Sequence, residues 1–224
     1  MLTFILYFMS CQIITVAQQK GGVGKSTISA HLAVCLMQKG RKVALIDIDP
    51  QGTLCKWYEI RESKYGTGFT GIHFISKSGW RVESELASLR QKYDYIIIDS
   101  PPHNETDAKT AIKSSNLVLL PMQASPTDLW AIKNTIKFCE QHSIPFQILL
   151  NRVQPNSKLT KQISDELPKM LQTTIGNRVV FASSMFEGKS ITELQPHSVA
   201  ATEIKNLTDE VEELLSPTEM KKAS

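Results

Sequence analysis

Short, fully apolar runs alternate along this chain with segments in which apolar residues recur every three or four positions. The apolar runs predict strands at residues 13–17, 43–47, 72–75, 95–99, 117–121, 146–151 and 179–181. Helical spacing predicts helices at residues 26–39, 51–61, 82–92 and 198–215, and a further helix that begins at residue 126. Because runs that are apolar throughout are typical of strands buried on both faces, the pattern predicts an α/β fold. We expect a doubly wound, mainly parallel sheet with helices on both faces.

The helix that begins at residue 126 carries a local start signal. Ser125 fits its N-cap, Pro126 fits its first helical position, and Asp128 fits the position of the acidic partner in a variant capping box. We therefore expect the Asp128 side chain to serve this helix end.

Composition narrows the class of protein. Of the 224 residues, 42% are hydrophobic and 21% are charged, which is enough apolar material for a core and excludes wholesale disorder. The net charge of +3 excludes a histone-like or polybasic protein. The four cysteines lie far apart without a C-x-x-C pair, so reduced thiols are favoured over a disulfide scaffold or a zinc ribbon.

The N-terminal apolar run at residues 2–8 is far shorter than the roughly 20 residues that a membrane helix needs. It also lacks the positive segment and cleavage site of a secretory signal. We interpret residues 1–11 as an extension with Met9 as an alternative start, residues 12–215 as one domain, and residues 216–224 as a tail.

A glycine-rich turn between the first predicted strand and the following helix indicates a phosphate-binding loop. Glycines allow successive backbone N–H groups to surround phosphates, and the helix N-terminus adds partial positive charge. In such a loop Lys25 reaches the β- and γ-phosphates of ATP, and the Ser26 hydroxyl is a ligand of Mg²⁺. The residues expected to bind the nucleotide are Gly21, Gly22, Val23, Gly24, Lys25, Ser26 and Thr27.

The loop departs from the standard pattern G-x-x-x-x-G-K-[ST]. That pattern requires glycine at position 19, where this chain has Gln19, and a second lysine, Lys20, stands five residues before Lys25. Residues 18–27 thereby resemble the deviant Walker A motif of the ParA/MinD-type ATPases, which have the P-loop NTPase fold. The resemblance implies that Lys20 crosses an ATP sandwich homodimer to the partner's phosphates and takes part in catalysis there.

Two further segments resemble motifs of the same family. Residues 47–52 are similar to its first switch, which implies that Asp49 positions the attacking water and that Asp47 lies near the Mg²⁺. Residues 95–102 are similar to its Walker B strand and second switch, which implies that Asp99 holds Mg²⁺ through a water. Asn151 ends a predicted strand where the family has an asparagine that bonds the adenine edge.

The resemblance extends over residues 12 to about 215 and is closest to the short ParA-type partition ATPases. Only 11 residues precede the predicted domain, which begins at residue 12, and this leaves no room for a helix-turn-helix region. The acidic segment 208–215 opposes binding to anionic membranes. Cys139 is the one cysteine after Asp99, which argues against an iron–sulfur branch.

This branch implies a cytoplasmic protein that associates with the nucleoid when ATP is bound. It implies nonspecific DNA binding, no membrane partner, and a small ParB-like DNA-binding adaptor that stimulates hydrolysis during plasmid or chromosome segregation. Basic residues of the second half could contact phosphates, namely Arg152, Lys158, Lys161, Lys169, Arg178, Lys189 and Lys205. A metabolic P-loop enzyme that ligates a small carboxylate remains the alternative, and Lys20 favours the partition ATPase.

Overall fold

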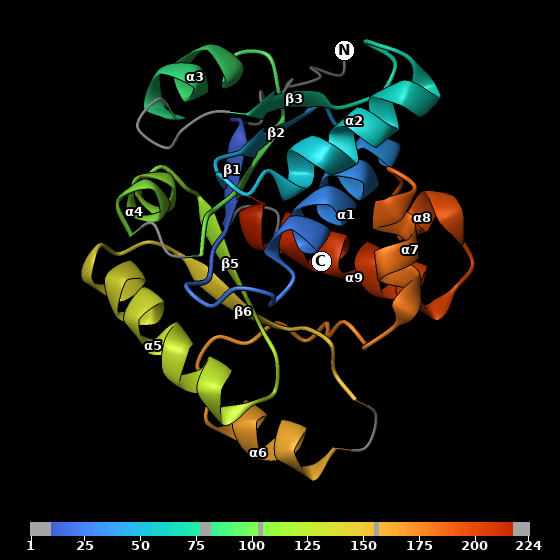
Figure 1. The fold of residues 1–224 in the computed structure, drawn as a ribbon. Helices are drawn as coiled ribbons and strands as arrows, with labels where there is room; N and C mark the ends of the chain where they lie inside the picture. The colour runs from blue at the N-terminus through green and yellow to red at the C-terminus, as the bar shows by residue number, and fades with distance from the viewer. Residues whose placement is uncertain (1–9, 77–81, 103–104, 155–156, 217–224) are drawn as a thin grey trace, which may run out of the picture.

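The computed structural model describes residues 10–76, 82–102, 105–154 and 157–216, and most of the predicted extension and tail lies outside these ranges. Within them, six strands form one sheet in the order β3-β2-β4-β1-β5-β6 (Figure 1). Every pairing is parallel. The strands are β1 (Gln12–Val16), β2 (Val43–Asp47), β3 (His73–Ser76), β4 (Tyr95–Asp99), β5 (Leu117–Met122) and β6 (Phe146–Leu150). The predicted α/β architecture is confirmed.

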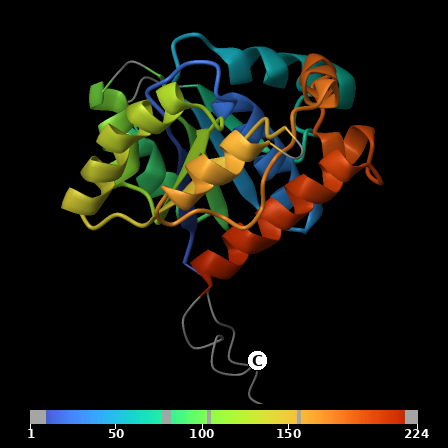
Figure 2. The same ribbon diagram turned by 90° about the horizontal axis from the view of Figure 1, so that it is seen from below.

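Helices cover both faces of the sheet because alternate strand residues point to opposite sides. They are α1 (Lys25–Gln38), α2 (Thr53–Tyr65), α3 (Val82–Leu89), α4 (Glu105–Lys113), α5 (Pro126–Gln141), α6 (Lys158–Asp165), α7 (Val179–Phe186), α8 (Ile191–Leu194) and α9 (Val199–Leu215). Ile14 and Ile97 pack with α1 and α9, whereas Ile96 and Val118 face the layer that contains α3, α4 and α5. Figures 1 and 2 show α9 and α5 on opposite sides of the sheet. No helix in the described part of the chain is long and apolar enough to cross a membrane.

The prediction of a strand at residues 179–181 is wrong, because these residues form the start of helix α7. The place beside β6 is already taken by the chain at residues 170–176, which bonds Ile148 and Val153 through single bridges. A strand at 179 would therefore find no sheet edge at this position. In the helix, Phe181 packs into the core while Val179 stays 83% exposed.

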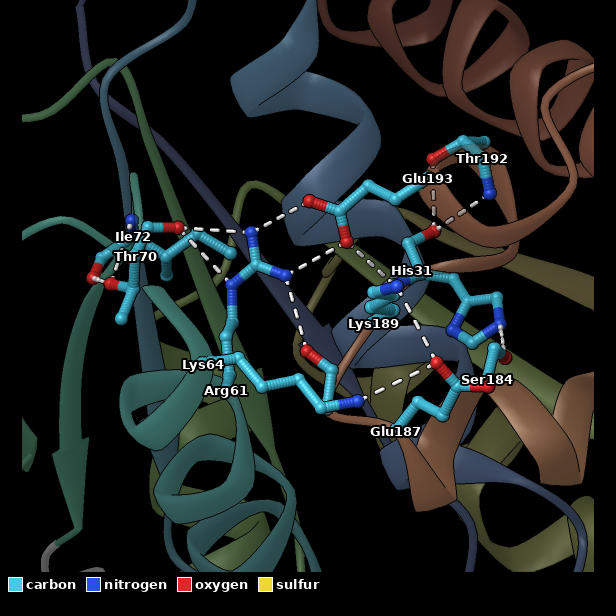
Figure 3. A network of polar contacts seen from close by, with 12 residues as sticks. His31, Arg61, Lys64, Thr70, Ile72, Ser184, Glu187, Lys189, Thr192 and Glu193 are labelled. Atoms are coloured by element: carbon cyan, nitrogen blue, oxygen red, sulfur yellow. Dashed lines mark hydrogen bonds and ion pairs between the residues drawn. The ribbon is translucent and has the colours of Figure 1, made fainter. Parts of the chain in front are cut away.

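A buried arginine ties α2 to α8 and to the turn between α7 and α8 (Figure 3). The Arg61 guanidinium is paired with both carboxylate oxygens of Glu193, each at 2.8 Å. It also donates to the carbonyl of Thr70 at 2.9 and 3.1 Å and to that of Gly188 at 3.2 Å. Gly188 has φ +64°, and a Cβ there would lie 2.4 Å from the backbone nitrogen of Arg61. The close approach therefore requires glycine at this position.

Candidate functional site

The residues expected to handle phosphate and metal meet at the carboxyl ends of three neighbouring strands. The glycine-rich loop follows β1, Asp47 ends β2, and Asp99 ends β4. In the sheet register Asp99 lies beside both Val16 and Asp47. Ligands of open parallel sheets bind at this edge, so the fold brings the predicted set together where its chemistry requires.

The conformation of the loop depends on Gly24, which has φ +96° and stands at the N-cap of α1. A Cβ at this position would lie 2.4 Å from the side-chain nitrogen of Asn151. That nitrogen donates to the carbonyl of Val23 at 2.7 Å, and Asn151 is 5% exposed. Asn151 therefore braces the loop from the end of β6, and its contact with adenine stays a prediction.

Lys25 is a buried cation without an anionic partner in the described chain. Its side chain lies inside the loop, where the residue is 6% exposed. Among the described residues, its ammonium donates to the carbonyl of Lys20 at 3.5 Å, and no carboxylate reaches ion-pair distance. Burial lowers the pKa of Lys25, while Asp99 and Asp49 act in the opposite direction. An anion placed in the loop would supply the missing partner.

A buried carboxylate faces the first turn of α1. Asp99 is fully buried, and its Oδ2 accepts a hydrogen bond of 2.6 Å from the Ser26 hydroxyl. Burial raises the pKa of Asp99 to about 8, with a smaller opposite effect from the Ser26 hydrogen bond. Burial also raises the pKa of Asp47, whose carboxylate accepts the backbone N–H groups of Asp49 and Cys55.

This oxygen set suits a magnesium ion that is carried by a nucleotide. Ser26 and Asp99 lie within hydrogen-bond distance of each other, and a cation would compensate the desolvated carboxylate. Mg²⁺ usually keeps water and phosphate ligands beside one or two protein oxygens, so Ser26 and Asp99 would suffice as its protein ligands.

Asp49 lies in the turn directly after β2, two residues after Asp47. Its carboxylate accepts the backbone N–H of Gln51 at 2.9 Å, which fixes the turn after β2. It is half-buried and close enough to influence the pKa of Lys25. Its expected role in positioning water stays a prediction.

Lys20 is bound within its own chain. Its ammonium donates to the Thr127 hydroxyl at 3.0 Å and forms an ion pair with Asp128, at the start of α5. Ser125 caps α5 as predicted, since its Oγ accepts the backbone N–H of Asp128 at 3.2 Å. The Asp128 carboxylate accepts the backbone N–H of Gln123 and the Ser125 hydroxyl, so it makes no reciprocal capping box.

A cavity of about 250 Å³ opens beside Gly24 and Thr27 and extends toward α7. Its other walls are Ile28, Asn151, Arg152, Ile175, Gly176, Asn177, Arg178, Val179, Phe181 and Ala182. Most of these residues belong to segments that the sequence did not associate with the site. Their proximity arises because the chain after β6 returns past the loop.

Three comparisons place the chain among known proteins. The sequence profile of the CobQ/CobB/MinD/ParA nucleotide-binding domain matches residues 14–191. The maintenance of carboxysome distribution protein A of Halothiobacillus neapolitanus is 29% identical over 88% of this chain and 95% of its own. A plasmid partition protein of Borrelia burgdorferi, solved with AMPPNP, superposes with a TM-score of 0.76 at 24% identity, over 91% of this chain and 99% of that one. The septum site-determining protein MinD of Pyrococcus horikoshii, solved with Mg-ADP, gives a TM-score of 0.77 at 22% identity, over 91% and 97%.

Proposed function

The chain belongs to the CobQ/CobB/MinD/ParA nucleotide-binding family as an ATPase of the ParA/MinD type, and we propose that it positions DNA or another cargo through an ATP-dependent sandwich dimer. In this proposal the dimer binds DNA without sequence preference. A small ParB-like adaptor on the cargo stimulates hydrolysis and releases it.

The observation that carries the proposal is a pair of buried ionisable side chains at the phosphate loop, neither of which has an ion-pair partner in the described chain. Lys25 is a buried cation without an anion in the described chain, and Asp99 is a buried carboxylate whose pKa is raised to about 8. Mg²⁺ and a triphosphate would neutralise both at once. The AMPPNP and Mg-ADP bound by the Borrelia and Pyrococcus proteins support this choice of ligand.

Each group then has a defined task in hydrolysis. Lys25 and the loop amides would hold the β- and γ-phosphates, and Ser26 with Asp47 and Asp99 would hold Mg²⁺, directly or through water. Bound Mg²⁺ supplies charge neutralisation on the phosphate oxygens. Asp49 would orient the attacking water in line with the γ-phosphate.

Dimerisation would follow from repulsion between two facing triphosphates. Each needs a cation from the opposite subunit, and Lys20 lies in the phosphate loop with a side chain that is 39% exposed. To reach the partner's phosphates, Lys20 must leave its contacts with Asp128 and Thr127.

The basic residues that remain accessible indicate where DNA would bind. Arg178 is paired with Glu203, Lys189 with Glu187, Lys205 donates to a backbone carbonyl, and Lys169 lies 4.7 Å from the centre of the Phe146 ring. By contrast, Arg152 after β6 and Lys158 and Lys161 on α6 are exposed, and their side chains make no ion pair or hydrogen bond with the described residues. We assign the phosphate contacts of nonspecific binding to these three residues.

The Lys20→Ala variant tests the proposal. Light scattering with a slowly hydrolysed ATP analogue should show dimers for the parent protein and monomers for the variant at the same concentration. ATP binding should persist in the variant because Lys25 and the loop amides remain. Parent-like dimerisation of the variant would refute the sandwich mechanism and favour a monomeric P-loop enzyme acting on a small carboxylate.

A further inference from the structure

We propose that Asp128 is a positioning residue that holds Lys20 within its own subunit and releases it only when a second ATP-loaded copy docks. This inference rests on the proposed function, because it assigns the control of Lys20 in the sandwich dimer. The contacts of the Lys20 ammonium with Asp128 and Thr127 are called the Lys20 latch below.

The Lys20 latch joins two sites that are 108 residues apart in the chain. Lys20 lies in the phosphate loop, whereas Asp128 and Thr127 belong to the first turn of α5. Asp128 is 0% exposed and carries a negative charge, while the Lys20 side chain is 39% exposed. A carboxylate in this position attracts the nearest mobile cation, and in the absence of a second subunit that cation is Lys20.

The start of α5 does not depend on Lys20 for its structure. Asp128 Oδ2 accepts the backbone N–H of Gln123 at 2.8 Å, and Oδ1 accepts the Ser125 hydroxyl at 2.9 Å. Ser125 in turn caps the helix through the backbone N–H of Asp128. When Lys20 departs, these three hydrogen bonds can remain, so the Lys20 latch can open without unfolding the helix end.

Opening the Lys20 latch leaves a buried carboxylate without its cation, and this opposes dimerisation. The loss of one charge-assisted contact of this kind corresponds to about a tenfold change in an equilibrium constant. Two subunits must each open one latch, so the dimer dissociation constant changes by the square, about a hundredfold. The Lys20 latch would thus keep the protein monomeric until bound ATP supplies a stronger site for the ammonium on the partner.

The Asp128→Asn variant separates this role from a structural one. An asparagine can still accept from Gln123 through its oxygen and donate to Ser125 Oγ through its nitrogen, yet it has no charge for Lys20. The matched control is Glu140→Gln, which removes one negative charge from an exposed position on the same helix. Twelve residues, or about 18 Å of helix, separate it from Asp128.

The dimer dissociation constant is measured by light scattering or sedimentation with the slowly hydrolysed ATP analogue. We expect Asp128→Asn to dimerise about a hundredfold more tightly than the parent, and Glu140→Gln to match the parent. Thr127→Val, at an exposed position, removes the weaker acceptor and should shift the constant measurably in the same direction, by about three- to tenfold. In a Lys20→Ala background, which is itself expected to be monomeric, Asp128→Asn should not restore dimerisation, because no ammonium remains to be held.

The outcomes distinguish the inference from its premise. If the parent forms no dimer with the ATP analogue, the proposed sandwich dimer is refuted, and the Lys20 latch is refuted with it. If the parent dimerises but Asp128→Asn dimerises equally or more weakly, at an unchanged melting temperature, the latch is refuted. An effect of Asp128→Asn that survives in the Lys20→Ala background would likewise refute it, because Asp128 would then act independently of Lys20. If Asp128→Asn has a lower melting temperature than the parent, the dimer dissociation constant of Thr127→Val becomes the test. A Thr127→Val constant equal to that of the parent would then overturn the proposal.

Discussion

Replacing Arg61 with alanine should destabilise the fold severely. The guanidinium is 1% exposed and uses all of its N–H groups on Glu193 and on the carbonyls of Thr70 and Gly188. Its removal leaves Glu193, whose side chain is 14% exposed, without a counterion. Breaking a buried ion pair by removing one partner costs about 3–5 kcal/mol. For a domain of this size each kcal/mol lowers the melting temperature by about 2–4 °C, so we expect a decrease of roughly 6–20 °C.

Urea unfolding of the parent and Arg61→Ala gives the change as a shift of the midpoint at constant slope. Lys64→Ala is the control from the same network (Figure 3), because Lys64 pairs with Glu187 at 3.5 Å with both side chains well exposed. That exposed pair should contribute at most about 0.5 kcal/mol. A loss below about 1 kcal/mol for Arg61→Ala, or one equal to that of Lys64→Ala, would show that the Arg61 network does not hold α2 in place.

The other predictions concern the phosphate site. Lys25→Ala should lose ATP binding in calorimetry, because the charge at the β- and γ-phosphates is removed; parent-like affinity would contradict the loop assignment. Asp49→Ala should bind ATP but hydrolyse it at least about a hundredfold more slowly in a phosphate-release assay, and normal turnover would mean that the water is held elsewhere. Since burial raises the pKa of Asp99 from 3.8 to about 8, the folded nucleotide-free protein retains a proton that the unfolded chain releases, and stability falls as pH rises through that window. Asp99→Asn should therefore raise the free energy of unfolding more at about pH 8 than at about pH 5 while weakening Mg²⁺-dependent ATP binding; equal effects at both pH values would argue against a buried charge.

The strands could be predicted because their own residues determine them. The runs at residues 43–47 and 95–99 match β2 and β4 residue for residue. Both strands are buried throughout, so their residues are apolar, except for the aspartate at the end of each strand, whose carboxylate accepts hydrogen bonds. The helix that Ser125 caps was predicted for the same local reason, since the cap requires residues only three apart.

The sequence-based predictions failed for elements whose structure depends on distant parts of the chain. The β-branched run at residues 179–181 favours a strand locally, but residues 170–176 occupy the sheet edge and α7 forms instead. Helices α4 and α6 were not predicted, since most of their residues are polar and their apolar stripes are short.

The site shows the same division between local and distant information. The glycines, Lys25 and Ser26 stand in one contiguous motif, and the three aspartates end or follow apolar strands, so the sequence brings each of them to the correct edge. The partner of Lys20 lies 108 residues away, and Asp128 was interpreted as a capping residue because its neighbours explain it locally. Only the packing of α5 against the phosphate loop reveals that its carboxylate is aimed at Lys20.

The arrangement of the site also explains why binding and stability should be coupled. Lys25 and Asp99 are both removed from water. Burial lowers the pKa of Lys25 and raises the pKa of Asp99, so it favours the neutral form of each side chain. Buried ionisable groups lower the free energy of unfolding of the nucleotide-free protein. The apolar core and the Arg61 network have to compensate for this loss of stability. A ligand that carries both a phosphate and a divalent cation neutralises the two groups together, and it binds the folded chain alone. Mg²⁺ and ATP should therefore raise the melting temperature more in combination than the sum of their separate effects, and additive shifts would mean that Lys25 and Asp99 do not share one ligand.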